Sequence, residues 1–160
     1  MTQNVICIPG TCSKEEYYNE KYPTAAHSHF FPWIQKQLYI RDIFCTCMQH
    51  FQQYDSNLDY RLWVREFEKL EFNENSTIVA HSSGCSFILR YLSEYFNLKC
   101  KKIILLAPYL EAFEGEDKEF YLYEIDKKLN GCSKFVCIYS LDDMEEIHKS
   151  TKKLKNNKKK

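Results

Sequence analysis

The sequence predicts a single α/β domain in which helices cover both faces of a mostly parallel β-sheet. Short apolar runs alternate along the chain with amphipathic stretches of helical length, which is the pattern of strand-helix-strand units. The 160 residues are enough for one domain with a sizeable core. Of these residues, 44% are hydrophobic and 16% aromatic, so we expect a folded globular chain rather than a fibrous or disordered one.

The expected elements follow one another in a regular order. The first strand is Asn4–Ile8, and an irregular loop is expected from Pro9 to Ser28. Further strands are expected at Ile43–Met48, Thr77–Ala80, Lys102–Ala107 and Lys134–Tyr139, and helices at about Phe30–Tyr39, after a cap at Asp55, Ser56 or Asn57, and after Ser82. The apolar run Lys102–Ala107 predicts a strand that is covered on both faces. The acidic segment Glu111–Asp126 either covers the functional site or is only a crossover.

Ser82 stands where a short apolar strand meets an amphipathic helix. The five residues Ala80-His81-Ser82-Ser83-Gly84 follow the pattern of a nucleophile elbow, G-x-S-x-G, with alanine in the first small position. Small residues are needed there because strand and helix backbones approach closely on either side of a strained serine. The following helix is expected to turn Phe87, Ile88, Leu92, Tyr95 and Phe96 inward and Arg90 and Glu94 outward. The alternative is a chance Ser-Ser-Gly turn.

The segments after the first and last predicted strands, Gly10-Thr11 and Asp142-Asp143, are expected at the same edge of the sheet as Ser82. Parallel strands share one carboxyl edge. An acyl-transfer site needs two amides that stabilise an oxyanion, and we assign these to Thr11 and Ser83. Asp142 and Asp143 follow the last strand and are placed to act as a catalytic acid, with helix capping as the alternative role. The alternative for the Pro9-Gly10-Thr11 segment is an ordinary strand-ending turn.

Four segments together resemble a known family. They are Ile8-Pro9-Gly10, Ser28–Trp33, Val79–Gly84 and Ser140–Asp143, and in this order they are similar to the small α/β-hydrolases grouped with retinoblastoma-binding protein 9 and its bacterial relatives. The resemblance implies a three-layer α/β-hydrolase-like domain, with Ser82 as nucleophile and Asp143 as the acid. It implies a serine hydrolase that needs no cofactor.

The chain departs from this family pattern after Asp143. The resemblance implies a catalytic histidine in a Gly-His element beyond a further strand, some two dozen residues after the acid, whereas 17 residues follow Asp143 here. We therefore expect the last strand, the histidine loop and the closing helix to be missing. His148 is the histidine that follows the acid, but its helical position predicts a solvent-facing ring. His81 is expected to be a packing and hydrogen-bonding residue.

Charge divides the chain into a domain at 1–148 and a Lys/Asn-rich tail at 149–160. Seven of the 22 basic residues lie in the tail, so residues 1–148 carry a net charge of −7. The tail is expected to be a solvated, disordered end, with contact to nucleic acid or an acidic surface as the alternative. The eight cysteines lack zinc-site spacing, and the pair His27 and His29 lacks matching ligands, so we expect no metal. Without a signal peptide or membrane span, a cytoplasmic protein with reduced thiols is expected.

Two functions follow from these observations. The first is a serine hydrolase acting on a small ester, amide or thioester, impaired by the missing histidine because Ser82 without a base is a weak nucleophile. The second is a catalytically inactive α/β-hydrolase fold that binds a small molecule or a protein partner. Neither membrane nor nucleic acid is expected as a partner.

Overall fold

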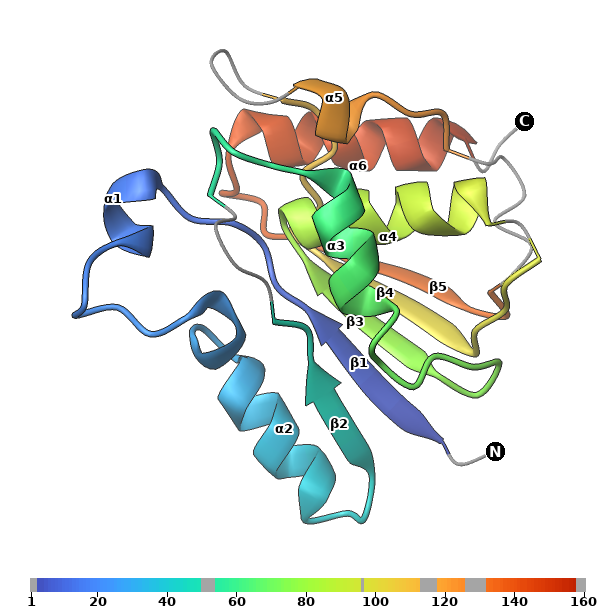
Figure 1. Ribbon diagram of the computed structural model, residues 1–160. Coiled ribbons are helices and arrows are strands. Elements are labelled where there is room, and N and C mark those ends of the chain that lie inside the picture. Colours follow the sequence, from blue (N-terminus) through green and yellow to red (C-terminus); the bar gives the residue numbers. More distant parts are fainter. Residues whose placement is uncertain (1–2, 50–53, 96, 113–117, 126–131, 158–160) are drawn as a thin grey trace.

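The computed structural model of the chain describes residues 3–49, 54–95, 97–112, 118–125 and 132–157 (Figure 1). In this part of the chain, five strands form one sheet in the order β2-β1-β3-β4-β5, and every neighbouring pair is parallel. The strands are β1 (Asn4–Ile8), β2 (Phe44–Cys47), β3 (Thr77–His81), β4 (Lys102–Leu106) and β5 (Phe135–Ile138). The predicted α/β class with a parallel sheet is confirmed, and all five carboxyl ends meet at one edge.

Helices cover both faces of this sheet. They are α1 (Lys14–Tyr17), the 3₁₀ turn η1 (Ala25–His27), α2 (Phe31–Tyr39), α3 (Tyr60–Phe67), α4 (Ser83–Glu94), α5 (Lys118–Tyr121) and α6 (Glu145–Asn157). Alternate residues of a strand point to opposite faces. In β1, Ile6 therefore belongs to the larger core cluster with Trp63 of α3 and Phe87 of α4, whereas Cys7 belongs to the smaller cluster with Phe31 of α2. The result is a three-layer arrangement (Figure 1).

The second face of β4 is less covered than its apolar sequence predicts. Ile103 and Leu105 are fully buried under the larger core cluster, but Ile104 and Leu106 on the opposite face are only partly buried. Ile138 of the neighbouring strand β5 is 53% exposed. The expectation that this strand is covered on both faces is therefore only partly right: Ile104 and Leu106 pack against the smaller core cluster, but α2 packs mainly against β2.

Several helix boundaries differ from the expected ones. Helix α3 begins at Tyr60, and its cap is Asp59, whose carboxylate accepts a hydrogen bond from the Arg61 amide at 2.9 Å. The expected caps at positions 55–57 are therefore wrong. The loop expected to be irregular between Pro9 and Ser28 contains α1 and η1.

Helix α6 continues into the basic segment that was expected to be a disordered end. It begins at Glu145 and ends at Asn157. Its buried residues Ile147, Ser150, Thr151 and Leu154 recur at the spacing of one helix face. The Ser150 hydroxyl also accepts a hydrogen bond from the Leu110 amide at 3.0 Å. Residues 149–157 are thus helical, because a half-apolar stripe between the lysines packs against the body of the protein.

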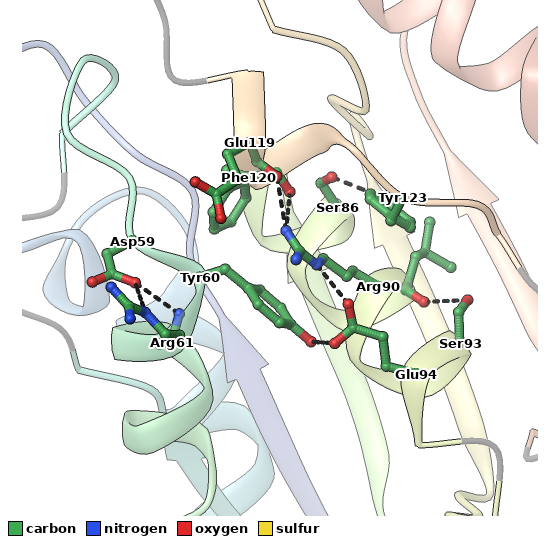
Figure 2. A network of polar contacts seen from close by, with 11 residues as sticks. Asp59, Tyr60, Arg61, Ser86, Arg90, Ser93, Glu94, Glu119, Phe120 and Tyr123 are labelled. Atoms are coloured by element: carbon green, nitrogen blue, oxygen red, sulfur yellow. Dashed lines mark hydrogen bonds and ion pairs between the residues drawn. The ribbon is translucent and has the colours of Figure 1, made fainter.

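Arg90 of α4 was expected to face solvent, but it joins three helices (Figure 2). Its guanidinium lies 3.7 Å from the ring centroid of Tyr60, pairs with Glu94 at 2.8 Å and donates to the Glu119 carbonyl at 2.8 Å. The expected apolar face of α4 is only partly right: Phe87, Ile88 and Leu92 are buried, Tyr95 is 44% exposed, and Phe96 lies outside the described residues. Arg90 therefore fastens α5 against α3 and α4.

Candidate active site

Ser82 occupies a strained turn between the central strand β3 and helix α4. Its backbone has φ 52° and ψ −124°, which is unfavourable for a residue with a Cβ atom. Main-chain bonds hold this conformation: the Ser82 amide donates to the Leu106 carbonyl at 3.1 Å, and the Ser82 carbonyl accepts from the amides of Cys85 and Tyr109. The hydroxyl of Ser82 is consequently placed at the carboxyl edge of the sheet, half-buried and without a hydrogen bond in the described part of the chain.

Two glycines allow the end of β1 to lie against this turn. A Cβ atom on Gly84 would come within 2.5 Å of the Pro9 carbonyl oxygen, which no side chain tolerates. A Cβ atom on Gly10 would lie 2.7 Å from the Ser82 Cβ and 3.3 Å from its Oγ. Gly10 is therefore a direct neighbour of the Ser82 hydroxyl. Ala80, in the other small position of the motif, is completely buried.

The structure brings Thr11 and Ser83 together through their side chains. Their hydroxyl oxygens are 3.1 Å apart, and the Tyr121 hydroxyl donates to Ser83 Oγ at 3.0 Å. On the other side, the Thr11 hydroxyl donates to Asp55 Oδ1 at 2.5 Å. The sequence reasoning chose Thr11 and Ser83 for their amides only, and it missed Asp55 and Tyr121 as members of the same group.

Two histidines lie next to one another beside Ser82. The rings of His81 and His29 are 5.5 Å apart, and Phe30 packs on His81 at the same centroid distance. Burial and, to a lesser extent, the nearby His29 lower the pKa of His81 to about 4, although the carboxylate of Asp143 acts in the opposite direction. His81 is therefore a neutral imidazole at pH 7. The expected packing role of His81 agrees with these contacts, while its ring makes no hydrogen bond to the residues that the structure describes.

The two aspartates after β5 differ in their surroundings. Asp143 is partly buried, and its Oδ2 accepts a hydrogen bond from the Ser140 amide at 2.6 Å. Asp142 is exposed, and a hydrogen bond from the Ser140 hydroxyl lowers its pKa. Of the two carboxylates, that of Asp143 raises the pKa of His81, against the effect of burial.

No imidazole forms a hydrogen bond with Ser82 or Asp143 among the residues that the structure describes. His148 is on α6, where its ring is partly buried against Tyr139 at a centroid distance of 5.7 Å. The expectation that this ring faces solvent is therefore only partly right. Neither His148 nor His81 joins the serine to the acid by a hydrogen bond.

A pocket of about 280 Å³ opens beside this turn. Its walls come from residues 9–12, from α1 and the segment 22–29, from the end of β2, and from His81. Tyr17, Tyr22 and Met48 contribute apolar surface, and Glu16 contributes a carboxylate. Gly10, which touches Ser82, and His81 line the pocket, whereas Ser82 itself does not line it.

Two further properties concern the described residues alone. Within the ranges given above, no three His, Cys, Asp or Glu side chains are grouped closely enough to hold a metal ion. None of the helices in those ranges is both long enough and apolar enough to cross a membrane.

The arrangement of strands and helices is that of an α/β-hydrolase-like fold. The crystal structure of the ydeN gene product from Bacillus subtilis matches it with a TM-score of 0.78 and 21% sequence identity, covering 98% of this chain and 81% of that one. In sequence, the chain is 29% identical over 87 residues to a protein of Bacillus subtilis (strain 168) described as "Putative hydrolase YdeN". That alignment covers 54% of this chain but only 45% of the relative, less than half of its length. No protein-family model matches the chain.

Proposed function

We propose that this chain is a serine hydrolase of the α/β-hydrolase type, with Ser82 as its nucleophile and a small ester, amide or thioester as its substrate. The observation that carries the proposal is the strained backbone of Ser82, which is held at φ 52° on a strand-to-helix turn at the carboxyl edge of the sheet. Backbone strain of this kind concentrates at catalytic residues. The description of the YdeN relative as a hydrolase supports the same class of activity.

The proposed reaction assigns one role to each residue of the site. Ser82 Oγ attacks the carbonyl carbon, the amides of Thr11 and Ser83 bind the oxyanion, and the leaving group departs with a proton. Water then cleaves the acyl-serine and restores the hydroxyl. Asp143 is the proposed acid that orients a base, as the resemblance to the small α/β-hydrolases implies.

The proposed reaction is expected to be slow because Ser82 has no hydrogen-bonded base in the part of the chain that the structure describes. An unassisted serine hydroxyl is a poor nucleophile at neutral pH, and no imidazole is hydrogen-bonded to Ser82 in the described residues. A serine protease that has lost a triad member still accelerates its reaction by roughly 10³- to 10⁴-fold over water. We therefore propose slow turnover on activated esters. The same observation favours a second function, in which the pocket binds a small ligand without cleaving it.

Labelling with a fluorophosphonate probe separates these functions. The wild-type chain should label slowly and stoichiometrically, Ser82→Ala should not label, and Ser133→Ala, which changes an exposed serine far along the sequence, should behave as wild type. Hydrolysis of p-nitrophenyl acetate should follow the same pattern. Labelling that persists in Ser82→Ala would contradict the assignment of the nucleophile. A wild-type chain that does not label but binds the uncleaved ester would favour the binding function.

A further inference from the structure

Four side chains behind the Ser82 turn form one continuous chain of hydrogen bonds. The Tyr121 hydroxyl donates to Ser83 Oγ at 3.0 Å, Ser83 Oγ lies 3.1 Å from Thr11 Oγ1, and Thr11 Oγ1 is 2.5 Å from Asp55 Oδ1. The Asp55 amide also donates to the Cys12 carbonyl at 3.0 Å. The chain thus connects α5, the first residue of α4, the loop after β1 and the loop before α3.

The carboxylate of Asp55, at the end of this chain, determines which group donates and which accepts in every hydrogen bond. An ionised carboxylate can only accept, so the Thr11 hydroxyl must donate its proton to Asp55. Thr11 Oγ1 can then only accept from Ser83, and Ser83 Oγ accepts from Tyr121. Each hydroxyl uses its single proton once. The Thr11 hydroxyl has no proton left for a substrate, and only its main-chain amide can stabilise an oxyanion.

The chain sets the position of the loop that carries the Thr11 amide. Gly10, one residue earlier, touches Ser82, and Ser83 is 2% exposed at the start of α4. Thr11 is therefore held between a buried hydroxyl on one side and a carboxylate on the other. Both residues whose amides are assigned to the oxyanion hole have their side chains tied to each other.

We propose that Asp55, acting through Thr11, is a positioning residue that holds the oxyanion-binding amides of Thr11 and Ser83 in register with Ser82. This inference rests on the proposed serine hydrolase function and adds Asp55 and Tyr121 to its machinery. Neither residue reaches the reacting atoms through this chain. Their effect is on geometry, which matters because oxyanion stabilisation depends on donors held at a defined distance from the developing charge.

The ionisation of Asp55 supports a role other than stability. Burial raises the pKa of Asp55, and the hydrogen bond from Thr11 acts in the opposite direction without cancelling this effect. The charged carboxylate is therefore unfavourable for folding at neutral pH. An uncharged residue at position 55 is therefore expected to suit the folded state at least as well, which is consistent with a positioning role for the carboxylate.

The test compares rates and stability in matched variants of the full chain. Thr11→Val, which keeps the shape and removes the hydroxyl, should lower kcat for p-nitrophenyl acetate and the rate of fluorophosphonate labelling by about 10- to 100-fold with KM nearly unchanged. Thr11→Ser should restore the rate to within about threefold, because the hydroxyl returns. Asp55→Asn should lower kcat by about 10-fold while leaving the urea midpoint at pH 7 unchanged or higher.

Asp59→Ala is the matched control, four residues further along the same segment. It removes the cap of α3, so its urea midpoint should fall while kcat stays at the wild-type value. A merely structural role for Asp55 would give this second pattern in Asp55→Asn and would overturn the proposal. Wild-type labelling rates in both Thr11→Val and Asp55→Asn would also overturn it while leaving the hydrolase function intact. Failure of the wild-type chain to label at all would end both proposals, and if Thr11→Val does not fold, Thr11→Ser and Asp55→Asn decide the outcome.

Discussion

The turn at Ser82 and the loop at Asp143 are held in very different ways, although both follow strands of the same sheet. Ser82 is fixed by main-chain bonds to Leu106 and Tyr109 and by contact with Gly10. Asp143 is held by two hydrogen bonds within its own loop: its carboxylate accepts from the Ser140 amide at 2.6 Å, and its amide donates to the Ser140 carbonyl at 3.4 Å. The neighbouring residues differ in the same way: Leu141, in the loop of Asp143, is 92% exposed, whereas Ser83, next to Ser82, is 2% exposed.

The difference follows from the order of the strands. β3 is the central strand, so the turn after it is surrounded by the ends of β1 and β4. β5 is an edge strand, and the loop after it has a neighbour on one side only. Ser82, at the centre of the sheet, is therefore positioned by packing, and Asp143, at the edge, is positioned by local hydrogen bonds. The four predictions below test this contrast.

The largest effect is expected where the Ser82 turn is packed most closely. Gly84→Ala would place a methyl group 2.5 Å from the Pro9 carbonyl oxygen and 2.7 Å from that of Ile8. Both obstacles are backbone atoms, so we expect a loss of about 3 kcal/mol in the free energy of unfolding, measured in urea. Ser93→Ala, on the same helix, adds no atom and should change it by less than about 0.5 kcal/mol. A Gly84→Ala protein as stable as wild type would contradict this account of the packing.

A second prediction concerns acid pH and the buried imidazole next to the turn. The pKa of His81 is about 4 in the folded protein, against 6.5 for an unperturbed histidine. The unfolded chain therefore binds a proton that the folded chain excludes, and stability is lost as the pH falls from 6.5 to about 4, by up to about 3 kcal/mol. His81→Gln should remove this dependence, as followed by urea unfolding at several pH values. His27→Gln, at an exposed position, should retain it, and equal slopes in both variants would refute the role of His81.

The third prediction tests the contacts that fasten α5 behind the turn. Arg90→Ala removes the bonds to the carbonyls of Glu119 and Phe120 and the contact with the Tyr60 ring (Figure 2). We expect a loss of about 1–2 kcal/mol, because the Arg90 side chain is only 15% exposed. Arg61→Ala is the control, since that side chain is 91% exposed and its change should be below about 0.5 kcal/mol. Similar losses in the two variants would show that α5 is not held by Arg90.

The smallest effect on stability is expected in the Asp143 loop. Asp143→Asn and Asp142→Asn should each leave the melting temperature within about 2 °C of wild type, because this loop makes few contacts with the rest of the molecule. Their labelling rates should differ. Asp143→Asn should lower fluorophosphonate labelling by at least about tenfold, and Asp142→Asn should not, since Asp143 is the proposed acid and its carboxylate influences the pKa of His81. A larger loss of labelling in Asp142→Asn than in Asp143→Asn would indicate that Asp142, not Asp143, is the acid.

Much of the sheet could be predicted from the sequence because its strands are short apolar runs. The predicted strand Asn4–Ile8 is confirmed with both boundaries, and the predicted strand and helix around Ser82 are also seen. The helix after Asp143 was expected, but its continuation into residues 149–157 was missed. The buried face Ile147, Ser150, Thr151 and Leu154 has helical spacing, but two of its members are polar and lysines surround it.

The hydrogen-bond chain behind Ser82 could not be predicted in the same way. Asp55 was weighed only as a helix cap, because nothing in its neighbours indicates that it meets Thr11, 44 residues earlier. Thr11 and Ser83 are 72 residues apart, and hydroxyl groups have no periodicity that would reveal a shared partner. Such contacts depend on how the loops pack at the edge of the sheet, which no local pattern in the sequence encodes.

The contact between Thr11 and Asp55 has a consequence for how this site can change in evolution. Loss of the threonine hydroxyl leaves a partly buried carboxylate without its donor, and loss of the carboxylate removes the group that orients three hydroxyls. Neither substitution is neutral alone, so the two positions are expected to vary together among descendants of this chain. A hydroxyl-bearing residue at position 11 should accompany an acidic residue at position 55, and an apolar residue at the first should accompany an uncharged one at the second. The residue pair at positions 11 and 55 would then identify descendants of this chain, even where the surrounding loops have diverged too far to be aligned.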